Sequence, residues 1–365
     1  MTLSLPKEWL DICQSMAIST YTPVQEQAFA PISAGENVLA ISPTGSGKTL
    51  AFLWPTLLSL KAKQGQQLLI LAPNSELAGQ LFEVAKTWAH PLSLNVQLFL
   101  SGSSQKRQIE RLKKAPEILI GTPGRIFELV KLKKIKLMAI NTIVLDEYDH
   151  LLEASQYQFV QKILSYVPKD HQLIFTSATD AVIDSNLPEP LTRISISQEQ
   201  DTLTHYYLQV EARDKVETLR KLSHLADMRA LVFFNQLSDV GNAEEKLLYR
   251  QANVASLASD VNVKFRKTIL ERFKNHHYTL LLVTDILARG IDIEQLEWVI
   301  NADLPVTQES FTHRIGRTGR MGQTGNVLTF ISNSRDLKTL KRYTQNPLTE
   351  VKIQRGQLVP VSKKG

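Results

Sequence analysis

The chain has 365 residues, of which 43% are hydrophobic, and its formal net charge is +6. This length predicts roughly two globular domains, and the basic balance weakly favours a polyanionic partner. Cys13 is the only cysteine, which excludes internal disulfides and cysteine-based zinc sites. The apolar runs are too short for a membrane span, and the N-terminus does not resemble a signal peptide. We therefore expect a cytoplasmic protein with no membrane partner.

In the first half, leucine-rich or β-branched runs alternate with amphipathic stretches, which predicts an α/β fold with a parallel sheet. The predicted strands are Val38–Ile41, Leu68–Ala72, Val96–Leu100, Ile118–Ile120, Ile143–Asp146 and Leu173–Ser177. The predicted helices include Lys48–Leu60, Ser75–His90, Ser103–Lys114 and Gly124–Leu132. A polar, poorly periodic segment follows and predicts a linker between domains.

The second half repeats this alternation. Its predicted strands are Tyr206–Val210, Ala230–Phe234, Val254–Leu257, Leu280–Thr284, Val299–Asn301 and Val327–Ile331. Its predicted helices are Lys215–Ala226, Ser238–Arg250, Val263–Lys274 and Glu309–Arg317. We therefore expect one α/β domain over 1–198, a linker at 199–204, a second α/β domain over 205–345 and a short tail at 346–365.

A glycine-rich run follows the first predicted strand, and it is similar to the phosphate-binding loop of nucleoside triphosphatases. Gly45 and Gly47 allow a tight turn whose N–H groups can point at phosphate oxygens. Lys48 adds a positive charge, and Thr49 offers a hydroxyl to Mg²⁺. The usual first glycine is Ser42 here, and an ordinary strand–loop–helix turn is the alternative. The predicted phosphate-binding residues are Thr44, Gly45, Ser46, Gly47, Lys48 and Thr49.

Two acids follow the apolar strand Ile143–Leu145, at the edge where open α/β sheets bind ligands. We predict that Asp146 binds Mg²⁺ and that Glu147 activates the attacking water. A helix cap or a surface ion pair is the alternative, but the phosphate loop upstream favours the catalytic interpretation.

Arginines recur every three residues in the segment 313–320, and they can share one face of a helix end. Guanidinium groups suit delocalised phosphate charge. We predict that Arg317 and Arg320 of the second domain reach the γ-phosphate when the two domains close. A nucleic-acid-binding patch or a solvated helix face is the alternative.

Together these runs resemble the DEAD-box ATP-dependent RNA helicases of superfamily 2, in that family's order over nearly the whole chain. Asp146-Glu147-Tyr148-Asp149 stands where the family has Asp-Glu-Ala-Asp, and Thr22-Pro23-Val24-Gln25 resembles its adenine-reading motif. The resemblance implies two tandem RecA-like domains, with ATP and Mg²⁺ as cofactors and Gln25 on the adenine. Trp9 could stack on the adenine or pack between helices.

The resemblance also implies further roles. Gly290 and Asp292 would bind nucleotide in the second domain. Coupling between ATP and RNA would use Ser177, Ala178, Thr179, Asp149 and His313. The residues implied for RNA binding are Pro73, Gly102, Thr122, Pro123, Gly124, Arg125, Asn235, Arg266, Thr284, Asp285 and Arg289.

The departures from the family pattern lie mainly among the RNA-binding motifs. Ser75 replaces an arginine, and Val263 replaces a glutamine. Because a lost charged contact weakens phosphate binding, we expect weaker or more selective RNA affinity. Tyr148 replaces the alanine of the acidic motif. Its phenol cannot act as a base at neutral pH, so we expect it to pack or to adjust the coupling.

We therefore predict an ATP-dependent RNA helicase that couples hydrolysis to RNA binding and to local duplex unwinding or remodelling of RNA–protein particles. The alternative is a nucleotide-dependent RNA clamp with little unwinding. A DNA translocase would share the ATP groups but would also respond to single-stranded DNA. We expect a monomer whose partners include ribosomal precursors or messenger RNA–protein particles.

Overall fold

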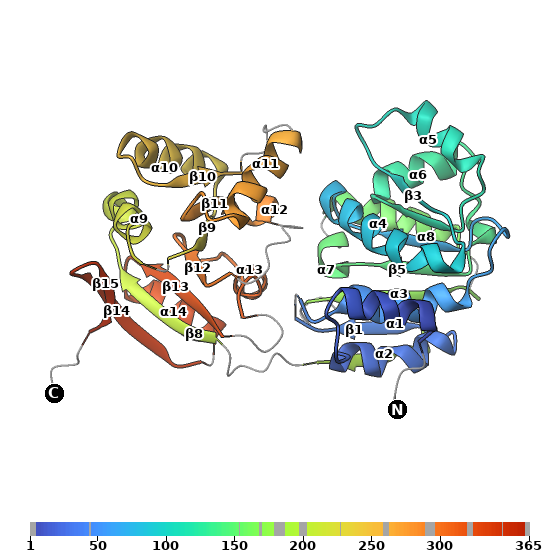
Figure 1. Ribbon diagram of the computed structural model, residues 1–365, viewed down its shortest axis with the longest axis horizontal. Helices are drawn as coiled ribbons and strands as arrows, with labels where there is room; N and C mark the ends of the chain where they lie inside the picture. The colour runs from blue at the N-terminus through green and yellow to red at the C-terminus, as the bar shows by residue number, and fades with distance from the viewer. Residues whose placement is uncertain are drawn as a thin grey trace. The chain divides into compact units, whose positions relative to one another are not determined.

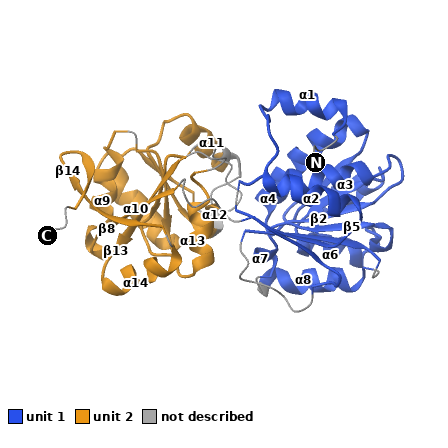
Figure 2. Cartoon of the chain, turned by 90° about the horizontal axis from the view of Figure 1, so that it is seen from below, with its two compact units in different colours: residues 1–198 blue, residues 199–365 orange. Residues whose placement is uncertain are grey.

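The computed structural model describes residues 5–43, 45–152, 154–167, 170–178, 187–196, 203–226, 228–257, 263–288, 296–319, 324–344 and 346–361. The chain divides into two compact units, the first covering residues 1–198 and the second residues 199–365 (Figure 2). Each unit has its own sheet and its own hydrophobic clusters. The prediction of two α/β halves with parallel sheets is confirmed.

The first unit contains a seven-stranded parallel sheet in the order β3-β4-β2-β5-β6-β1-β7 (Figure 1). Its strands are β1 (Val38–Ile41), β2 (Leu68–Leu71), β3 (Val96–Phe99), β4 (Ile118–Gly121), β5 (Thr142–Leu145), β6 (Gln172–Ser177) and β7 (Thr192–Ser195). Its helices are α1 (Lys7–Ser15), α2 (Pro23–Ser33), α3 (Lys48–Ser59), α4 (Ser75–Ala89), η1 (His90–Leu92), α5 (Gln105–Leu112), α6 (Pro123–Lys131), η2 (Leu137–Ala139), α7 (Tyr148–Leu151) and α8 (Ala154–Ser165).

Helices cover both faces of this sheet, so its central strands are buried. On one face, α1 to α4 pack with a cluster in which the ring of Trp88 contacts Trp9 and Trp54 at centroid distances of 5.5 and 5.2 Å. Trp9 is fully buried and donates a 2.9 Å hydrogen bond to the carbonyl of Trp88. Trp9 is therefore a core residue, and the adenine-stacking alternative is wrong.

The second unit contains an eight-stranded sheet in the order β10-β11-β9-β12-β13-β8-β14-β15. Its strands are β8 (Leu203–Gln209), β9 (Ala230–Phe234), β10 (Val254–Ser256), β11 (Leu280–Thr284), β12 (Trp298–Asn301), β13 (Gly325–Ile331), β14 (Leu348–Gln354) and β15 (Gln357–Pro360). Its helices are η4 (Ala212–Asp214), α9 (Lys215–Ser223), α10 (Leu237–Tyr249), α11 (Val263–Lys274), α12 (Asp285–Ala288), α13 (Gln308–Ile315) and α14 (Ser334–Tyr343).

The C-terminal segment differs from the tail that we expected at 346–365. Strand β14 pairs in parallel with β8, and β15 turns back on β14 to form the one antiparallel pair among the described strands. Val351 of β14 is buried in the cluster that also contains Val254 and Leu280, so this hairpin belongs to the second unit. In the part of the chain that the structure describes, no helix has the length and apolar character needed to span a membrane.

Candidate active site and nucleic-acid interface

Three neighbouring strands of the first unit lead into the phosphate loop, the acidic motif and the segment that begins at Ser177. The parallel pairs β5–β6 and β6–β1 place the carboxyl ends of these strands side by side. The N–H of Ser42, which follows β1, donates a 3.0 Å hydrogen bond to the carbonyl of Ser177 at the end of β6. The phosphate loop and the acidic motif therefore lie on either side of one strand.

The phosphate loop turns through two glycines with positive φ, Gly45 at 82° and Gly47 at 88°. L side chains rarely adopt this conformation. A Cβ at Gly47 would also lie 2.4 Å from Nε2 of Gln25, so this position requires glycine for space as well. The hydroxyls of Ser42 and Ser46 lie 2.8 Å apart and brace the loop from within.

Lys48 opens α3 and keeps its ammonium group within the loop. Its Nζ donates hydrogen bonds to the carbonyl oxygens of Ser42 and, at 3.0 Å, of Pro43. The positive end of the α3 dipole lies at the same place. A cation held beside the first N–H groups of a helix is an arrangement that attracts anions such as phosphate.

Gln25 connects α2 to the phosphate loop. It is 4% exposed; its Oε1 accepts a 3.0 Å hydrogen bond from the N–H of Thr22, and its Nε2 donates a 3.3 Å bond to the carbonyl of Gly47. The amide therefore caps α2 and positions the loop at once. A carboxamide has four hydrogen-bonding positions, so two remain for the predicted contact with adenine.

Asp146 is a buried acid at the end of β5. Its Oδ1 accepts a 2.6 Å hydrogen bond from the hydroxyl of Thr176 on β6, and this hydroxyl accepts a 3.1 Å bond from the N–H of Glu147. Burial, with the negative charge of Glu147 as the next cause, raises the pKa of Asp146 to about 6, against the opposing effects of the Thr176 hydrogen bond and the Lys48 charge. A buried carboxylate whose hydrogen-bond donor is a neutral hydroxyl is suited to binding a cation.

Glu147 and Tyr148 follow with different surroundings. Glu147 has a left-handed backbone with a φ of 50° and precedes α7. Tyr148 is 4% exposed, and its ring lies 4.8 Å from that of Phe175 on β6. The expectation that Tyr148 packs is confirmed, because its ring packs α7 on β6, the strand that carries Thr176 and Ser177.

Arg125, which was predicted to bind RNA, is 8% exposed and holds the loop after β3. Its guanidinium donates 3.2 Å hydrogen bonds to the carbonyls of Leu100 and Ser103 and forms a 3.0 Å ion pair with Glu128. These contacts fix the exposed loop that carries Gly102. The structure therefore assigns Arg125 a positioning role toward this loop.

The other predicted RNA residues of the first unit lie at strand ends and helix starts. Thr122 is the N-cap residue of α6, which begins at Pro123, and Pro73 is buried before α4. The side chain of Asn74 accepts hydrogen bonds from the N–H groups of Glu76 and Leu77 and so caps α4. The next residue, Ser75, is exposed.

In the second unit, Asn235 and Asp285 are brought together by a residue that we did not single out. Arg314 of α13 is fully buried and makes a two-pronged ion pair with Asp285, at 2.6 and 2.8 Å. It also donates 2.7 and 2.8 Å hydrogen bonds to Oδ1 of Asn235 and to the carbonyl of Asp303. Arg314 lies within the segment 313–320, which the sequence marked as functional. The spacing of its arginines did not show that Arg314 has a different role from Arg317 and Arg320.

The remaining predicted residues of the second unit are partly or fully buried, and some predicted residues lie outside the described part of the chain. Thr284 is buried at the end of β11, and His313, Arg317 and Arg266 are half-buried on or beside α13 and α11. The predictions for Thr44, Thr179, Arg289, Gly290, Asp292 and Arg320 lie outside the residues that the structure describes.

Comparisons with known proteins follow the same division of the chain. A family model described as DEAD/DEAH box helicase matches residues 22–184, and one described as helicase conserved C-terminal domain matches residues 214–322. The chain is 41% identical over 328 residues to the probable ATP-dependent RNA helicase YfmL of Bacillus subtilis, covering 88% of this chain and 87% of that relative. It is 36% identical to the DEAD-box ATP-dependent RNA helicase CshC of Bacillus cereus, covering 88% and 84%.

Solved structures are similar over almost the whole chain. S. cerevisiae Dbp5 bound to RNA and ADP BeF3 gives a TM-score of 0.82 at 26% identity, covering 95% of this chain and 94% of that chain. Mss116p bound to single-stranded RNA and AMP-PNP gives a TM-score of 0.80 at 22% identity, covering 96% and 78%, and supports the fold alone.

Proposed function

The chain belongs to the DEAD-box family of ATP-dependent RNA helicases, and we propose how its residues share the work of ATP hydrolysis and RNA binding. It has two RecA-like α/β domains and is an enzyme that hydrolyses ATP. One observation carries the assignment of residues: β6 contacts the phosphate loop through Ser177 and the acidic motif through Thr176. A change at either element can therefore reach the other through one strand.

Lys48 and the N–H groups at the start of α3 are proposed to bind the phosphates of ATP. Lys48 already lies within the loop, and the helix dipole favours negative charge there. Gln25, which holds the carbonyl of Gly47, is proposed to read adenine with its two remaining hydrogen-bonding positions. Adenine binding and the position of the loop would then depend on the same side chain.

Asp146 and Thr49 would hold Mg²⁺, which offsets phosphate charge when it is bound. Their oxygen donors fit this ion, and the raised pKa of Asp146 reflects a buried charge that a cation would stabilise. Glu147 is proposed to orient the water whose oxygen bonds to the γ-phosphorus as the bond to the ADP oxygen breaks. The hydrogen bond from its N–H to Thr176 sets its position beside Asp146.

From the second unit, Arg317 and Arg320 are proposed to stabilise the charge that develops on the transferred phosphoryl group, and Gly290 and Asp292 to contact the nucleotide. Asn235, Thr284, Asp285, Arg266 and Arg289 are proposed to bind RNA. Arg314 holds the side chains of Asn235 and Asp285 by hydrogen bonds, so we assign it a positioning role.

Two assays, RNA-stimulated ATP hydrolysis and displacement of a strand from an RNA duplex, distinguish an unwinding enzyme from an RNA clamp. The exposed Ser75, where the family has an arginine, favours a weaker hold on RNA and keeps the clamp as a second candidate. We expect RNA to stimulate ATP hydrolysis and ATP to drive displacement of a strand from a short RNA duplex. Stimulated hydrolysis without strand displacement would establish the clamp, and equal stimulation by single-stranded DNA would contradict RNA specificity.

The cellular setting is a further part of the proposal. We propose a cytoplasmic monomer that acts on ribosomal precursors or messenger RNA–protein particles. The absence of disulfide chemistry supports a reducing compartment, since Cys13 is the single cysteine. Crosslinking the protein to cellular RNA and sequencing the fragments would test the choice of RNA; recovery of neither class would contradict it.

A further inference from the structure

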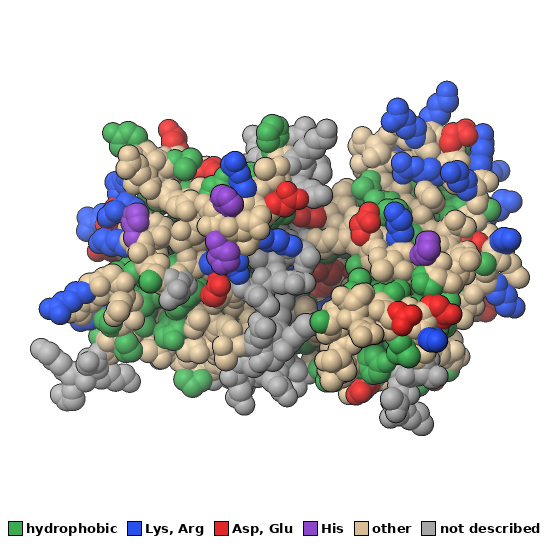
Figure 3. Space-filling view, in the orientation of Figure 1, with side chains coloured by type: hydrophobic (Ala, Val, Ile, Leu, Met, Phe, Trp, Pro, Cys, Tyr) green, Lys and Arg blue, Asp and Glu red, His purple; other side chains and the backbone are tan. Residues whose placement is uncertain are grey.

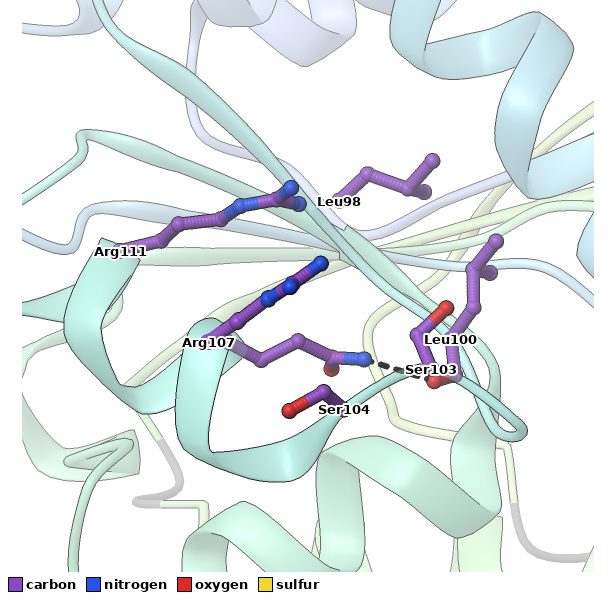
Figure 4. A pocket seen from close by; sticks show the side chains of 7 residues that line it. Leu98, Leu100, Ser103, Ser104, Arg107 and Arg111 are labelled. Carbon is purple, nitrogen blue, oxygen red and sulfur yellow. Dashed lines mark hydrogen bonds between the residues drawn. The ribbon is translucent and has the colours of Figure 1, made fainter.

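A pocket of about 300 Å³ lies between α5 and the end of the edge strand β3. It is lined by Leu98, Leu100, Ser103, Ser104, Arg107, Gln108 and Arg111. Arg107 and Arg111 are one helical turn apart and share a face of α5. Figure 4 shows their side chains extending in the same direction across this pocket, with Leu98 and Leu100 on its other side. The pocket therefore combines two planar cations, two hydroxyl residues and an apolar wall.

The surroundings of the pocket are strongly basic. Residues 105–114 contain the cations Lys106, Arg107, Arg111, Lys113 and Lys114 and the single acid Glu110. Glu110 forms its 2.8 Å ion pair with Lys113. Among the described residues, no carboxylate or hydrogen-bond partner is found for the guanidinium group of Arg107 or of Arg111, and both residues are exposed. Figure 3 shows Lys and Arg side chains gathered over the end of the first unit that carries α5.

The pocket shares a wall with the loop that carries Gly102, which the family resemblance predicts to bind RNA. Nε2 of Gln108 donates a 2.8 Å hydrogen bond to the carbonyl of Leu100, and Arg125 bonds to the same carbonyl and to that of Ser103. Gly102 lies between these two anchored carbonyls. A strand that contacts Gly102 therefore reaches the pocket within the next nucleotides.

We propose that this pocket is an additional RNA-binding site of the first unit. Arg107 and Arg111 bind backbone phosphates of the strand beyond Gly102, and one unpaired base enters against Leu98 and Leu100. Guanidinium planes both pair with phosphates and stack on bases, and base contacts with flat or apolar side chains tolerate any sequence. The pocket size suits one base, at the lower end of ligand sites. An acidic peptide fits the pocket less well, because its carboxylates would pair with the arginines but would leave Leu98 and Leu100 without an apolar partner.

This proposal deepens the proposed RNA-binding function and rests on it. Arg107 and Arg111 also add positive charge to a unit in which Ser75 stands where the family has an arginine. The consequence is a dependence on RNA length. A short RNA that ends at the Gly102 loop gains nothing from the pocket, whereas a longer RNA does.

The test compares binding of a short and a long oligouridylate, of about 8 and about 20 nucleotides, by fluorescence anisotropy with AMP-PNP present. The variant is Arg107→Gln with Arg111→Gln. The matched control is Lys7→Gln with Lys86→Gln, which removes the same charge from exposed positions on α1 and α4. We expect the wild-type preference for the long RNA to fall by roughly tenfold in the arginine variant and to stay unchanged in the control.

The salt dependence gives a second readout. Losing two phosphate contacts lowers the slope of log affinity against log salt by about 1.4 for single strands. An arginine variant that keeps the wild-type preference for long RNA would overturn the pocket while leaving the proposed function intact. Wild-type protein that binds neither RNA would overturn both the pocket and the proposed function. An equal loss of affinity in the lysine control would show that overall positive charge, and not the pocket, causes the effect, and would overturn the pocket.

Discussion

Each unit buries one arginine among its described residues, and the two arginines do different work. Arg125 in the first unit donates to backbone carbonyls of one loop and pairs with the half-exposed carboxylate of Glu128. Arg314 in the second unit is fully buried and pairs on two prongs with Asp285, beside the amide of Asn235. The first arginine holds a surface loop, whereas the second pairs with a partly buried carboxylate.

This difference shows how to separate arginines that position other residues from arginines that meet a ligand. Arg125 and Arg314 both lie in motifs that the sequence associates with RNA or ATP, yet their donors already bond to the protein. Arg107 and Arg111 lie in no such motif, and their guanidiniums face a pocket. Burial and bonding partners therefore decide the role where spacing cannot.

Replacing Arg314, the more deeply buried of the two arginines, should have the largest effect on stability. In Arg314→Gln, the 29% exposed carboxylate of Asp285 loses its counter-charge, and Asn235 and the carbonyl of Asp303 lose a buried donor, which together should cost about 3–5 kcal/mol of unfolding free energy. Denaturant unfolding of the full chain measures it. The matched control, Arg335→Gln on the exposed side of α14, should change by less than about 0.5 kcal/mol. Equal stability of both variants would mean that the Asp285 pair contributes nothing net.

His205 extends the comparison to a buried group for which the described residues show no counter-charge. It is 2% exposed on β8, with its ring 6.0 Å from that of Phe311, and burial lowers its pKa from 6.5 to about 4. The unfolded chain therefore binds more protons between these pH values. The stability contributed by neutral His205 is complete above pH 6.5 and should fall by up to about 3 kcal/mol as the pH drops to 4.

Unfolding measured across this pH range, with two variants, isolates the contribution of His205. His205→Leu should flatten the dependence, whereas His224→Leu, at an exposed position, should leave it as in the wild type. A His205→Leu protein with an unchanged slope would show that other groups cause it.

Replacing Arg125 should have the smallest effect on stability. Arg125→Gln removes hydrogen bonds to carbonyls that water can partly replace, so we expect a loss of about 1–2 kcal/mol. The local effect should be clearer: hydrogen exchange at residues 100–104 should accelerate while the sheet stays protected. Unchanged exchange in this loop would remove the positioning role from Arg125.

Most central strands and helices were predictable because buried parallel strands read as continuous apolar runs, as at Leu68–Leu71 and Leu280–Thr284. The strands that were not predicted are polar and lie at sheet edges. In β7, Thr192–Ser195, Ile194 is the buried residue, and the β14–β15 hairpin is mostly half-buried, with Val351 as its buried residue. Such short segments acquire their structure from pairing with a neighbour, which the local pattern does not contain.

The candidate site was predictable where a motif carries its chemistry locally, as in the turn through Gly45 and Gly47. The bonds that organise the site join distant positions, and spacing cannot give them. Gln25 meets Gly47 across 22 residues, and Arg314 meets Asn235 across 79. Arg314 could not be distinguished from Arg317 without knowing which face of α13 packs on the sheet.

The most direct test of the account is the rate of ATP hydrolysis, with and without RNA, in the wild type and in Glu147→Gln. The substitution keeps the shape of the side chain and removes its ability to accept a proton. We expect RNA to accelerate the wild type, and the RNA-stimulated kcat of Glu147→Gln to fall by at least about 100-fold with RNA binding retained. A wild-type rate that ignores RNA, or a Glu147→Gln enzyme as fast as the wild type, would contradict the account.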